Sequence, residues 1–493
     1  MAVSRESPAN AFRVRGNLED LLGYASAYLK DLATGMVPPG DGEFAGYDPK
    51  IVRIRAQLSR YADINWPVPR KISRPNASRV SRVAIVALVA TAACGDPSVD
   101  EASATQRYDS AGVAVVVSDA PPLIRVLAAS PRASIGVASG DSAYLLADVS
   151  GASLLDDGRI VIANCLPPLL RWYDTSGAYL MGAGREGEGP TEFPKGACAR
   201  LFGISALTNG RVETWEHTHH RLRVFDSLGT QVSTRVLAAK SLAPGPEFLG
   251  KFERGYLMGE YPGRVHQHYF SGLDSWRDTL VMHAFGEDGD YEGIIGRTAG
   301  WPFTRTVLPT RFGPRGAVVL VPFAPLGMAA PWGPTVAVGD GSGPEVRVLD
   351  RGGKLTTIIR WKAERIAVTD SLIEILIDEA VSLETEGPSY KKTTREAFEA
   401  HPYPDTARSY SRLLVGRDGL LWVRQFSPPG ATSATWLAFA ASGSLVAAMD
   451  QPSGTTVLEI GDDYLLLLVE NSLGVESVVL HDITELNPKR SDR

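Results

Sequence analysis

This chain has little cysteine, little net charge and none of the common catalytic signatures. Its 493 residues include three cysteines, and no two of them form the CxxC pair that a cysteine-built zinc site requires. The net charge of −6 offers no broad cationic surface, so we expect no nucleic-acid partner. The sequence also lacks the G-x-S-x-G, Walker, HExxH and EF-hand patterns. Their absence weakens the common hydrolase and nucleotide-binding interpretations.

A short apolar segment with a basic flank lies well inside the chain. Residues 83–93, VAIVALVATAA, carry no charge; their number suits the apolar region of a signal peptide, whereas a membrane-spanning helix needs about 20 such residues. The preceding residues, 68–82, include five basic side chains and no acidic one. The pattern predicts an export signal; a short buried helix or strand is the alternative.

The residues that follow resemble a bacterial lipobox. Thr91, Ala92 and Ala93 lead into Cys94, with Thr91 in the place where leucine or valine is usual. The resemblance implies that residues 68–94 are a lipoprotein signal peptide and that Cys94 is lipidated and becomes the first mature residue. Residues 95–110 are small and polar, as in a flexible tether. We therefore expect an exported protein of the periplasm or cell envelope, held to a membrane by its lipid anchor.

Residues 1–67 come before a signal that operates at a true N-terminus. We interpret them as an extension from a start codon assigned too early, with Val68 or Val80 as the initiator. The alternative is a genuine helical extension, because LEDLLGYASAYLKDL, residues 18–32, carries apolar residues at helical spacing.

Repeats organise the chain after residue 110. Two segments align without a gap, LLDDGRIVIANCLPPLLRWYDTSGAYL from Leu154 and ALTNGRVETWEHTHHRLRVFDSLGTQV from Ala206, and looser or partial copies begin at Val346, Leu413 and Gly461. Each full copy has an Asp-Gly or Asn-Gly turn, a strand, a loop and a second strand that ends in an aromatic residue and Asp. Asp, Asn and Gly tolerate positive φ, so we predict that each unit is a four-stranded antiparallel meander.

The repeat units number about six when two diverged units, at 246–286 and 303–361, are included. We therefore predict an all-β fold, a six-bladed β-propeller over residues 111–484, followed by a polar tail, 485–493; five or seven blades are the alternatives. Residues 111–119, AGVAVVVSD, are expected to close the ring by pairing with the last blade.

A helical insertion interrupts the strands at about residues 369–400. Ser371 and Glu374 have the spacing of a capping box, and apolar residues follow at helical spacing. A second helical segment, KKTTREAFEA, ends before Pro402. We interpret the pair as surface helices that cover a propeller edge; a lid or a partner-docking insertion is the alternative.

A glycine-rich segment, GAGREGEGPTEFPKG, occupies residues 182–196. It resembles the G-x-x-G-x-G-x-x-x-F-x-x-P signature of NHL-type propellers and, more closely, the GREGEGPGEF stretch of bacterial six-bladed β-propeller lipoproteins of uncharacterised function, with Thr191 in place of a glycine. The resemblance covers most of residues 107–484; it implies a fold and says almost nothing about activity. The residues expected to link two blades, with the aromatic ring filling the interface, are Gly184, Arg185, Gly187, Gly189, Pro190 and Phe193.

The same segment contains the carboxylates of Glu186, Glu188 and Glu192 beside Arg185. Acid–base catalysis needs one carboxyl that is buried and has a raised pKa. In a glycine-rich linker we expect these groups to be solvated or paired with Arg185. The catalytic residues, if there are any, are therefore unknown.

Histidine and cysteine supply two further candidate sites. His217, His219, His266 and His268 lie in two short clusters and are candidate ligands for a divalent ion, because alternate residues of a strand share one face. The alternative is that these histidines are solvent-exposed loop residues without a ligand. We predict no cofactor. Cys165 and Cys198 are candidates for a disulfide in an oxidising compartment, or else remain two half-buried thiols.

Two hypotheses for function follow. The first is a membrane-tethered binding or scaffold module for an unknown protein or small-molecule ligand. The second is a lactonase, hydrolase or lyase with a divalent ion in the propeller channel, although fold by itself cannot establish an activity. Three or more His, Asp, Glu or Asn side chains around one point in the channel would favour the enzyme.

Overall fold

The structure is a computed structural model of the whole chain, and its placed residues begin at 105. It describes residues 105–486 except 120, 122, 167, 188, 190, 194–200, 217–219, 238–245, 263–273, 309–314, 384–386 and 472. The predicted extension, signal peptide and lipidated Cys94, and most of the predicted tether and polar tail, lie outside the described residues.

The turns that define the repeat form for the expected reason. Asp174 directly follows a strand, and its Oδ1 accepts hydrogen bonds from the backbone N–H groups of Ser176 and Ala178 at 2.8 and 2.9 Å. Asp226 makes the equivalent bonds in the second copy, at 2.9 and 2.8 Å. Asn209 of the other turn adopts φ +62°, which asparagine tolerates. Side-chain hydrogen bonds therefore fold the chain back at each repeat.

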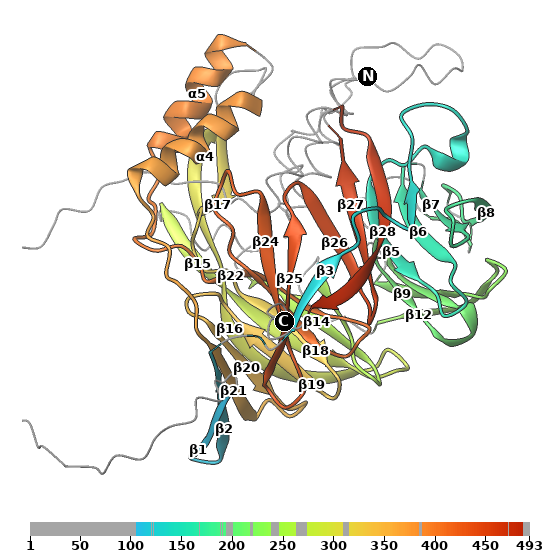
Figure 1. Cartoon of the computed structure of the whole chain (residues 1–493), viewed down its shortest axis with the longest axis horizontal. Helices are drawn as coiled ribbons and strands as arrows, with labels where there is room; N and C mark the ends of the chain where they lie inside the picture. The colour runs from blue at the N-terminus through green and yellow to red at the C-terminus, as the bar shows by residue number, and fades with distance from the viewer. Residues whose placement is uncertain are drawn as a thin grey trace, which may run out of the picture.

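Six antiparallel meanders result, and each runs outward from an inner strand. The first three follow one another from turquoise through green to yellow in Figure 1. The first has β5 (Val149–Leu154), β6 (Ile160–Cys165), β7 (Pro168–Tyr173) and β8 (Tyr179–Ala183); the second has β9 (Leu201–Ala206), β10 (Val212–Glu216), β11 (Arg221–Phe225) and β12 (Gln231–Val236); the third has β13 (Glu247–Lys251), β14 (Tyr256–Glu260), β15 (Ser275–Phe285), β16 (Tyr291–Leu308) and β17 (Arg315–Leu320).

The other three meanders complete the circuit, so that the red strands β27 and β28 lie beside the first meander in Figure 1. The fourth has β18 (Met328–Trp332), β19 (Thr335–Gly339), β20 (Glu345–Leu349) and β21 (Leu355–Trp361); the fifth has β22 (Tyr410–Val415), β23 (Leu421–Gln425), β24 (Ser433–Phe439) and β25 (Leu445–Pro452); the sixth has β26 (Thr455–Ile460), β27 (Tyr464–Glu470), β28 (Glu476–Leu486) and β4 (Ala133–Ile135).

The two diverged units divide differently from the prediction. β15 and β16 form a long hairpin, and β17 pairs with the far half of β16. Residues 303–308 and 315–320 therefore belong to the third meander, which has five strands instead of four. Trp276, Phe303 and Leu320 are buried together in this extension, so its strands are held by an apolar cluster of their own.

Ring closure uses a different segment from the predicted one. Residues 113–118 form β2 (Val113–Ser118), which pairs in parallel with β21 of the fourth meander, and β1 (Gln106–Ser110) pairs on its outer side. The strand that completes the sixth meander is β4, which pairs with β28. Between them, β3 (Leu123–Leu127) joins β25 to β28. The expectation that residues 111–119 close the ring was therefore wrong.

An apolar cluster fills each contact between successive meanders. The six clusters join the first meander to the second, and so on around the ring to the sixth and the first. The last contact has a polar component as well, because Glu459 of β26 accepts hydrogen bonds from the Ser153 hydroxyl and from the Leu154 N–H of β5. Sheets that pack face to face around an axis in this way form a β-propeller, so the predicted fold class is confirmed.

The helical insertion is present as α4 (Asp370–Leu383) and α5 (Pro388–Glu399). The N-terminal cap is Thr369 rather than Ser371, because the Thr369 hydroxyl accepts a hydrogen bond from the Leu372 N–H at 3.2 Å. The pair stands at one side of the ring in Figure 1, and its apolar face is buried against Phe323 and Phe426.

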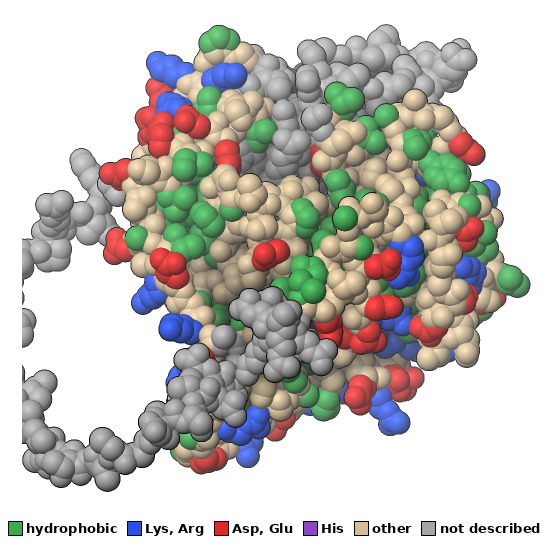
Figure 2. Space-filling model, viewed as in Figure 1, with side chains coloured by type: hydrophobic (Ala, Val, Ile, Leu, Met, Phe, Trp, Pro, Cys, Tyr) green, Lys and Arg blue, Asp and Glu red, His purple; other side chains and the backbone are tan. Residues whose placement is uncertain are grey.

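Basic and acidic side chains intermingle over the face shown in Figure 2, in keeping with the small net charge. Within the part of the chain that the structure describes, no helix is long and apolar enough to cross a membrane.

Candidate functional site

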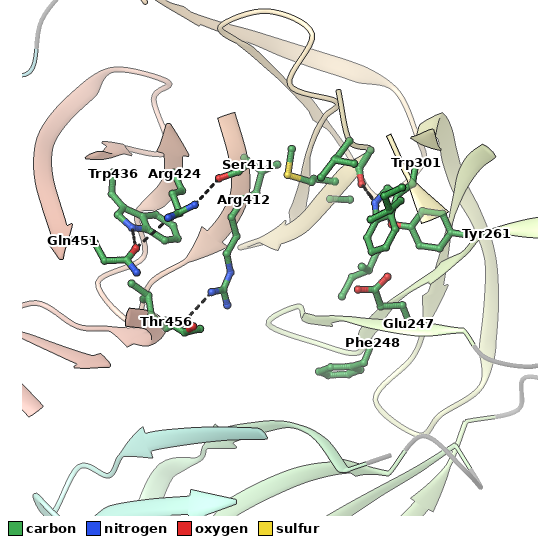
Figure 3. A pocket seen from close by; sticks show the side chains of 18 of the residues that line it. Glu247, Phe248, Tyr261, Trp301, Ser411, Arg412, Arg424, Trp436, Gln451 and Thr456 are labelled. Atoms are coloured by element: carbon green, nitrogen blue, oxygen red, sulfur yellow. Dashed lines mark hydrogen bonds between the residues drawn. The ribbon is translucent and has the colours of Figure 1, made fainter. Parts of the chain in front are cut away.

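The inner strands enclose a cavity of about 320 Å³, a size typical of small-molecule sites. Strands β13, β18, β22 and β26 contribute to its wall, so the cavity lies in the axial channel (Figure 3). The side chains that give it its chemistry are Glu247, Phe248, Tyr261, Trp301, Met328, Ser411, Arg412, Arg424, Trp436, Gln451 and Thr456.

One wall of the cavity is a hydrogen-bonded polar network from the fifth and sixth meanders. Gln451 is at its centre: its Oε1 accepts from Trp436 Nε1 at 2.7 Å and from Arg424 Nε at 3.3 Å. Its Nε2 donates to the carbonyl oxygen of Thr455 at 2.6 Å. Arg424 also donates from Nη1 to the hydroxyl of Ser411 at 3.0 Å. Because every one of these groups is held by another, the wall is pre-organised.

Arg412 extends into the cavity from β22 (Figure 3). Its Nη1 donates to the carbonyl oxygen of Val457 on β26 at 2.9 Å. This bond joins the inner strands of the fifth and sixth meanders and fixes the direction of the guanidinium group. The cavity therefore has a positively charged group at a defined position.

The opposite wall is aromatic and comes from the third meander. The rings of Tyr261 and Trp301 lie with their centroids 5.2 Å apart. Trp301 Nε1 and Tyr261 Oη both donate to the carbonyl oxygen of Gly327, at 3.0 and 3.4 Å. Their polar atoms are thus directed at the loop between β17 and β18, while both residues border the cavity.

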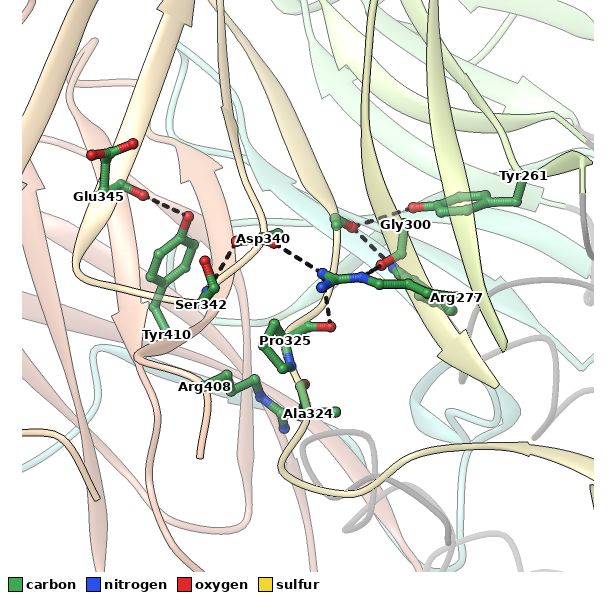
Figure 4. A network of polar contacts seen from close by, with 12 residues as sticks. Tyr261, Arg277, Gly300, Ala324, Pro325, Asp340, Ser342, Glu345, Arg408 and Tyr410 are labelled. Atoms are coloured by element: carbon green, nitrogen blue, oxygen red, sulfur yellow. Dashed lines mark hydrogen bonds and ion pairs between the residues drawn. The ribbon is translucent and has the colours of Figure 1, made fainter. Parts of the chain in front are cut away.

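A second network holds that loop in place (Figure 4). Arg277 of β15 donates from Nε to the Gly300 carbonyl at 3.2 Å and from Nη2 to the Pro325 carbonyl at 3.3 Å, and its Nη2 lies 3.0 Å from Asp340 Oδ2. A Cβ at Gly327 would collide with the backbone of residues 299 and 300, so only glycine allows this approach. The aromatic wall is therefore positioned by Arg277 and by the absence of a side chain at Gly327.

The linker residues lie between the first and second meanders, away from the cavity. Phe193 is fully buried there, its ring 6.3 Å from that of Phe225, and the Arg223 guanidinium lies over it at 5.1 Å. Gly184 packs so closely against Phe193 that a Cβ would collide with the ring. Pro190 lies outside the described residues.

The carboxylates of this segment lack the environment of a catalytic acid wherever the structure describes them. Glu192 accepts from the Gly189 N–H at 2.9 Å and from Arg185 Nε at 2.6 Å. The Gly189 bond first, and then Arg185, hold the pKa of Glu192 below its usual value. Such a carboxylate stays ionised and pairs with Arg185, as the sequence favours. Glu188 is not among the described residues.

The structure describes only some of the residues predicted to bind a metal or to form a disulfide. His217, His219, His266 and His268 lie outside the described residues, and so does Cys198. Cys165 is fully buried at the end of β6. Among the residues that are described, no group of three or more His, Cys, Asp or Glu side chains is close enough to hold a metal ion.

No family model matches the sequence, and no curated protein does. Among solved structures, a member of the DUF4221 family from Bacteroides vulgatus is similar at 10% identity and a TM-score of 0.38, with 74% of this chain and 99% of that chain covered. A gluconolactonase from Xanthomonas campestris is similar at 11% identity and a TM-score of 0.33 (68% and 86% covered), and a virginiamycin B lyase from Staphylococcus aureus at 8% and 0.31 (69% and 96% covered). At these TM-scores the similarities carry no argument about function.

The cavity residues were not among the sequence-based candidates. A partial signal is present in YSRLLV, residues 410–415, where Ser411 and Arg412 place polar groups in a strand of the repeat. Glu247, Tyr261 and Trp301 come from the most diverged unit. Since the repeat pattern is weakest there, inner-strand positions could not be assigned from the sequence.

Proposed function

We propose that this protein is a β-propeller binding module that holds a small-molecule ligand in its axial cavity. The observation that carries the proposal is the cavity itself, which combines a pre-ordered polar wall around Gln451 with an aromatic wall around Trp301. Pockets that bind small molecules have this combination of apolar surface and a few fixed polar groups. The second sequence-based hypothesis, metal-dependent catalysis, gains no support from the described residues.

The setting of this module is proposed from the sequence. We take the six meanders as the six blades of one ring and Cys94 as a lipid-anchored first residue, so that the propeller stands outside the cytoplasm on a tether. The predicted tether, residues 95–110, is too long at its end, because residues 106–110 form β1 and pair with β2. The apolar segment 83–93 with its basic flank supports export. Mass spectrometry of the mature N-terminus tests this part: a diacylated or triacylated Cys94 is expected, and an unmodified chain that begins upstream of residue 68 would contradict it.

Ligand binding is tested by a thermal-shift screen of a metabolite library. A compound that binds only the folded state raises the melting temperature, and the shift increases with the ratio of its concentration to its dissociation constant. Thr456 is a small, half-buried residue of the cavity wall, so Thr456→Phe is expected to fill the cavity and abolish the shift. Thr234→Phe, on the exposed strand β12, is the matched control. Shifts that persist in Thr456→Phe would place the binding site elsewhere.

A further inference from the structure

The two walls of the cavity differ in chemistry, and this difference indicates the class of ligand. Resting on the proposed function, we infer that the cavity takes a small monoanion with an aromatic body: its carboxylate bonds to Arg412, and its ring packs against Tyr261 and Trp301. The argument rests on where the charges lie, on the orientation of the two rings and on the position of Glu247.

Positive charge is concentrated on the polar wall. Arg412 extends into the cavity and is oriented by its 2.9 Å bond to the Val457 carbonyl. A guanidinium of fixed direction suits a carboxylate, which accepts two parallel N–H bonds from it. Arg424 stands behind this position with its side chain almost fully buried. Ser411 and Gln451 accept hydrogen bonds from its guanidinium group and hold it in place.

The aromatic wall offers rings for an apolar partner. Tyr261 is largely buried and Trp301 half-buried, and the Gly327 carbonyl takes a hydrogen bond from each. Because their polar atoms are satisfied by the loop, what these residues add to the cavity is ring surface. An aromatic ligand gains both the burial of its surface and the favourable geometry of tilted rings here. A small aliphatic anion such as acetate would leave this wall uncovered.

Glu247 sets a limit on the charge of the ligand. It lines the same cavity from β13, across the opening from Arg412 (Figure 3). A ligand that places its carboxylate on Arg412 directs its far end toward the wall that carries Glu247. A second anionic group at that end would meet a like charge, which disfavours it. The cavity is therefore expected to prefer monoanions over dianions of the same length.

Isothermal titration calorimetry at pH 7 with four probes tests this inference. Phenylacetate is the expected ligand; 2-phenylethylammonium has a similar body with opposite charge, acetate lacks the ring, and 1,4-phenylenediacetate adds a second carboxylate. We expect phenylacetate to bind at least about tenfold more tightly than each of the others, since one charge-assisted hydrogen bond or one buried ring is worth about that factor.

Three variants and one control assign the effect to particular residues. Arg412→Gln is expected to raise the dissociation constant for phenylacetate about tenfold or more, and Arg412→Lys, which keeps the charge without the planar fork, by less. The matched control is Arg417→Gln, because Arg417 also donates from Nη1 to a carbonyl of another meander, that of Leu154 in the first, but does not line the cavity. Glu247→Gln is expected to improve binding of 1,4-phenylenediacetate selectively.

The outcomes separate the ligand class from the proposed function. Tighter binding of the ammonium probe, no binding of phenylacetate at millimolar concentration, or an Arg412→Gln variant that folds and binds phenylacetate like wild type would each overturn the inference while the cavity remains a binding site for other compounds. If phenylacetate binds equally well to Thr456→Phe, the cavity is not the site, and the proposed function fails with the inference.

Discussion

Ser134 of β4 pairs with Val479 of β28, so the strand that completes the last meander comes from the beginning of the described chain. The adjacent Ile135 is fully buried between the sixth and the first meander. Closure of the ring thus depends on three residues that are far in sequence from β28, the strand with which they pair. Pairings of this kind are costly in chain entropy and form late.

Truncation of Ile135 tests how much this closure contributes. Ile135→Ala is expected to lower the free energy of unfolding by about 2–5 kcal/mol, as for other fully buried isoleucines, and urea denaturation measures it. Val232→Ala, on the exposed side of β12 with 53% of its surface accessible, should change it by less than about 0.5 kcal/mol. Equal effects of the two substitutions would show that β4 does not hold the ring.

The linker aromatic provides a second test. Phe193→Ala removes a fully buried ring from the contact between the first two meanders, and we expect a loss of about 3–5 kcal/mol in the free energy of unfolding. The control is Leu228→Ala, because Leu228 lies at a turn and is 78% exposed. A loss below about 1 kcal/mol for Phe193→Ala would mean that the ring is not a structural plug.

His401 makes stability depend on pH. It follows α5, is 1% exposed and lies against the rings of Phe398 and Tyr403; neither ring nitrogen has a hydrogen-bond partner among the described residues. Burial lowers the pKa of His401 to about 2 from its ordinary value of 6.5. Below pH 6.5 the unfolded chain therefore binds one more proton than the folded chain, so this contribution to stability is complete above pH 6.5 and falls as the pH falls toward 2.

Urea denaturation at pH 7 and pH 5 measures this effect. Wild type is expected to lose about 2 kcal/mol from His401 between the two pH values, and His401→Leu should remove that part of the loss. Phe398→Leu, which weakens the same cluster without removing a titratable group, should lower stability at both pH values and keep the wild-type difference. An unchanged pH difference in His401→Leu would refute the assignment.

Arg277 is expected to hold the loop behind the aromatic wall from outside the cavity. Arg277→Met removes the bonds to the Gly300 and Pro325 carbonyls and to Asp340, which hold the loop that orients the aromatic wall. Hydrogen exchange of the Gly327 amide, bonded to Gly300, should become about fivefold faster, corresponding to about 1 kcal/mol. Arg347→Met, which breaks an exposed pair with Glu345, is the control and should leave that amide unchanged.

The repeat and its local chemistry could be predicted because their causes are local. Asp174 and Asp226 fold their turns through bonds to backbone groups two and four residues ahead, so the sequence shows them directly. The helical insertion follows from apolar spacing, although its cap moved from Ser371 to Thr369 because both residues have a hydroxyl able to cap and only the path of the preceding chain selects between them.

The long-range relations could not be predicted, because the same local pattern permits several of them. β2 and β4 are both short strands with apolar side chains, and strand propensity does not specify a partner; the structure pairs β2 with β21 and β4 with β28. For the same reason the boundary of the third meander and the residues of the cavity were missed.

The sequence by itself determined a chain of antiparallel meanders, a pair of helices and an aromatic linker residue, because turns, caps and periodicity act within a few residues. Only the tertiary structure decided which strand closes the ring and that Arg412, Glu247 and Trp301 share one cavity. These residues come from meanders far apart in the chain, and they meet because the apolar faces of all six meanders can be buried together only around a common axis.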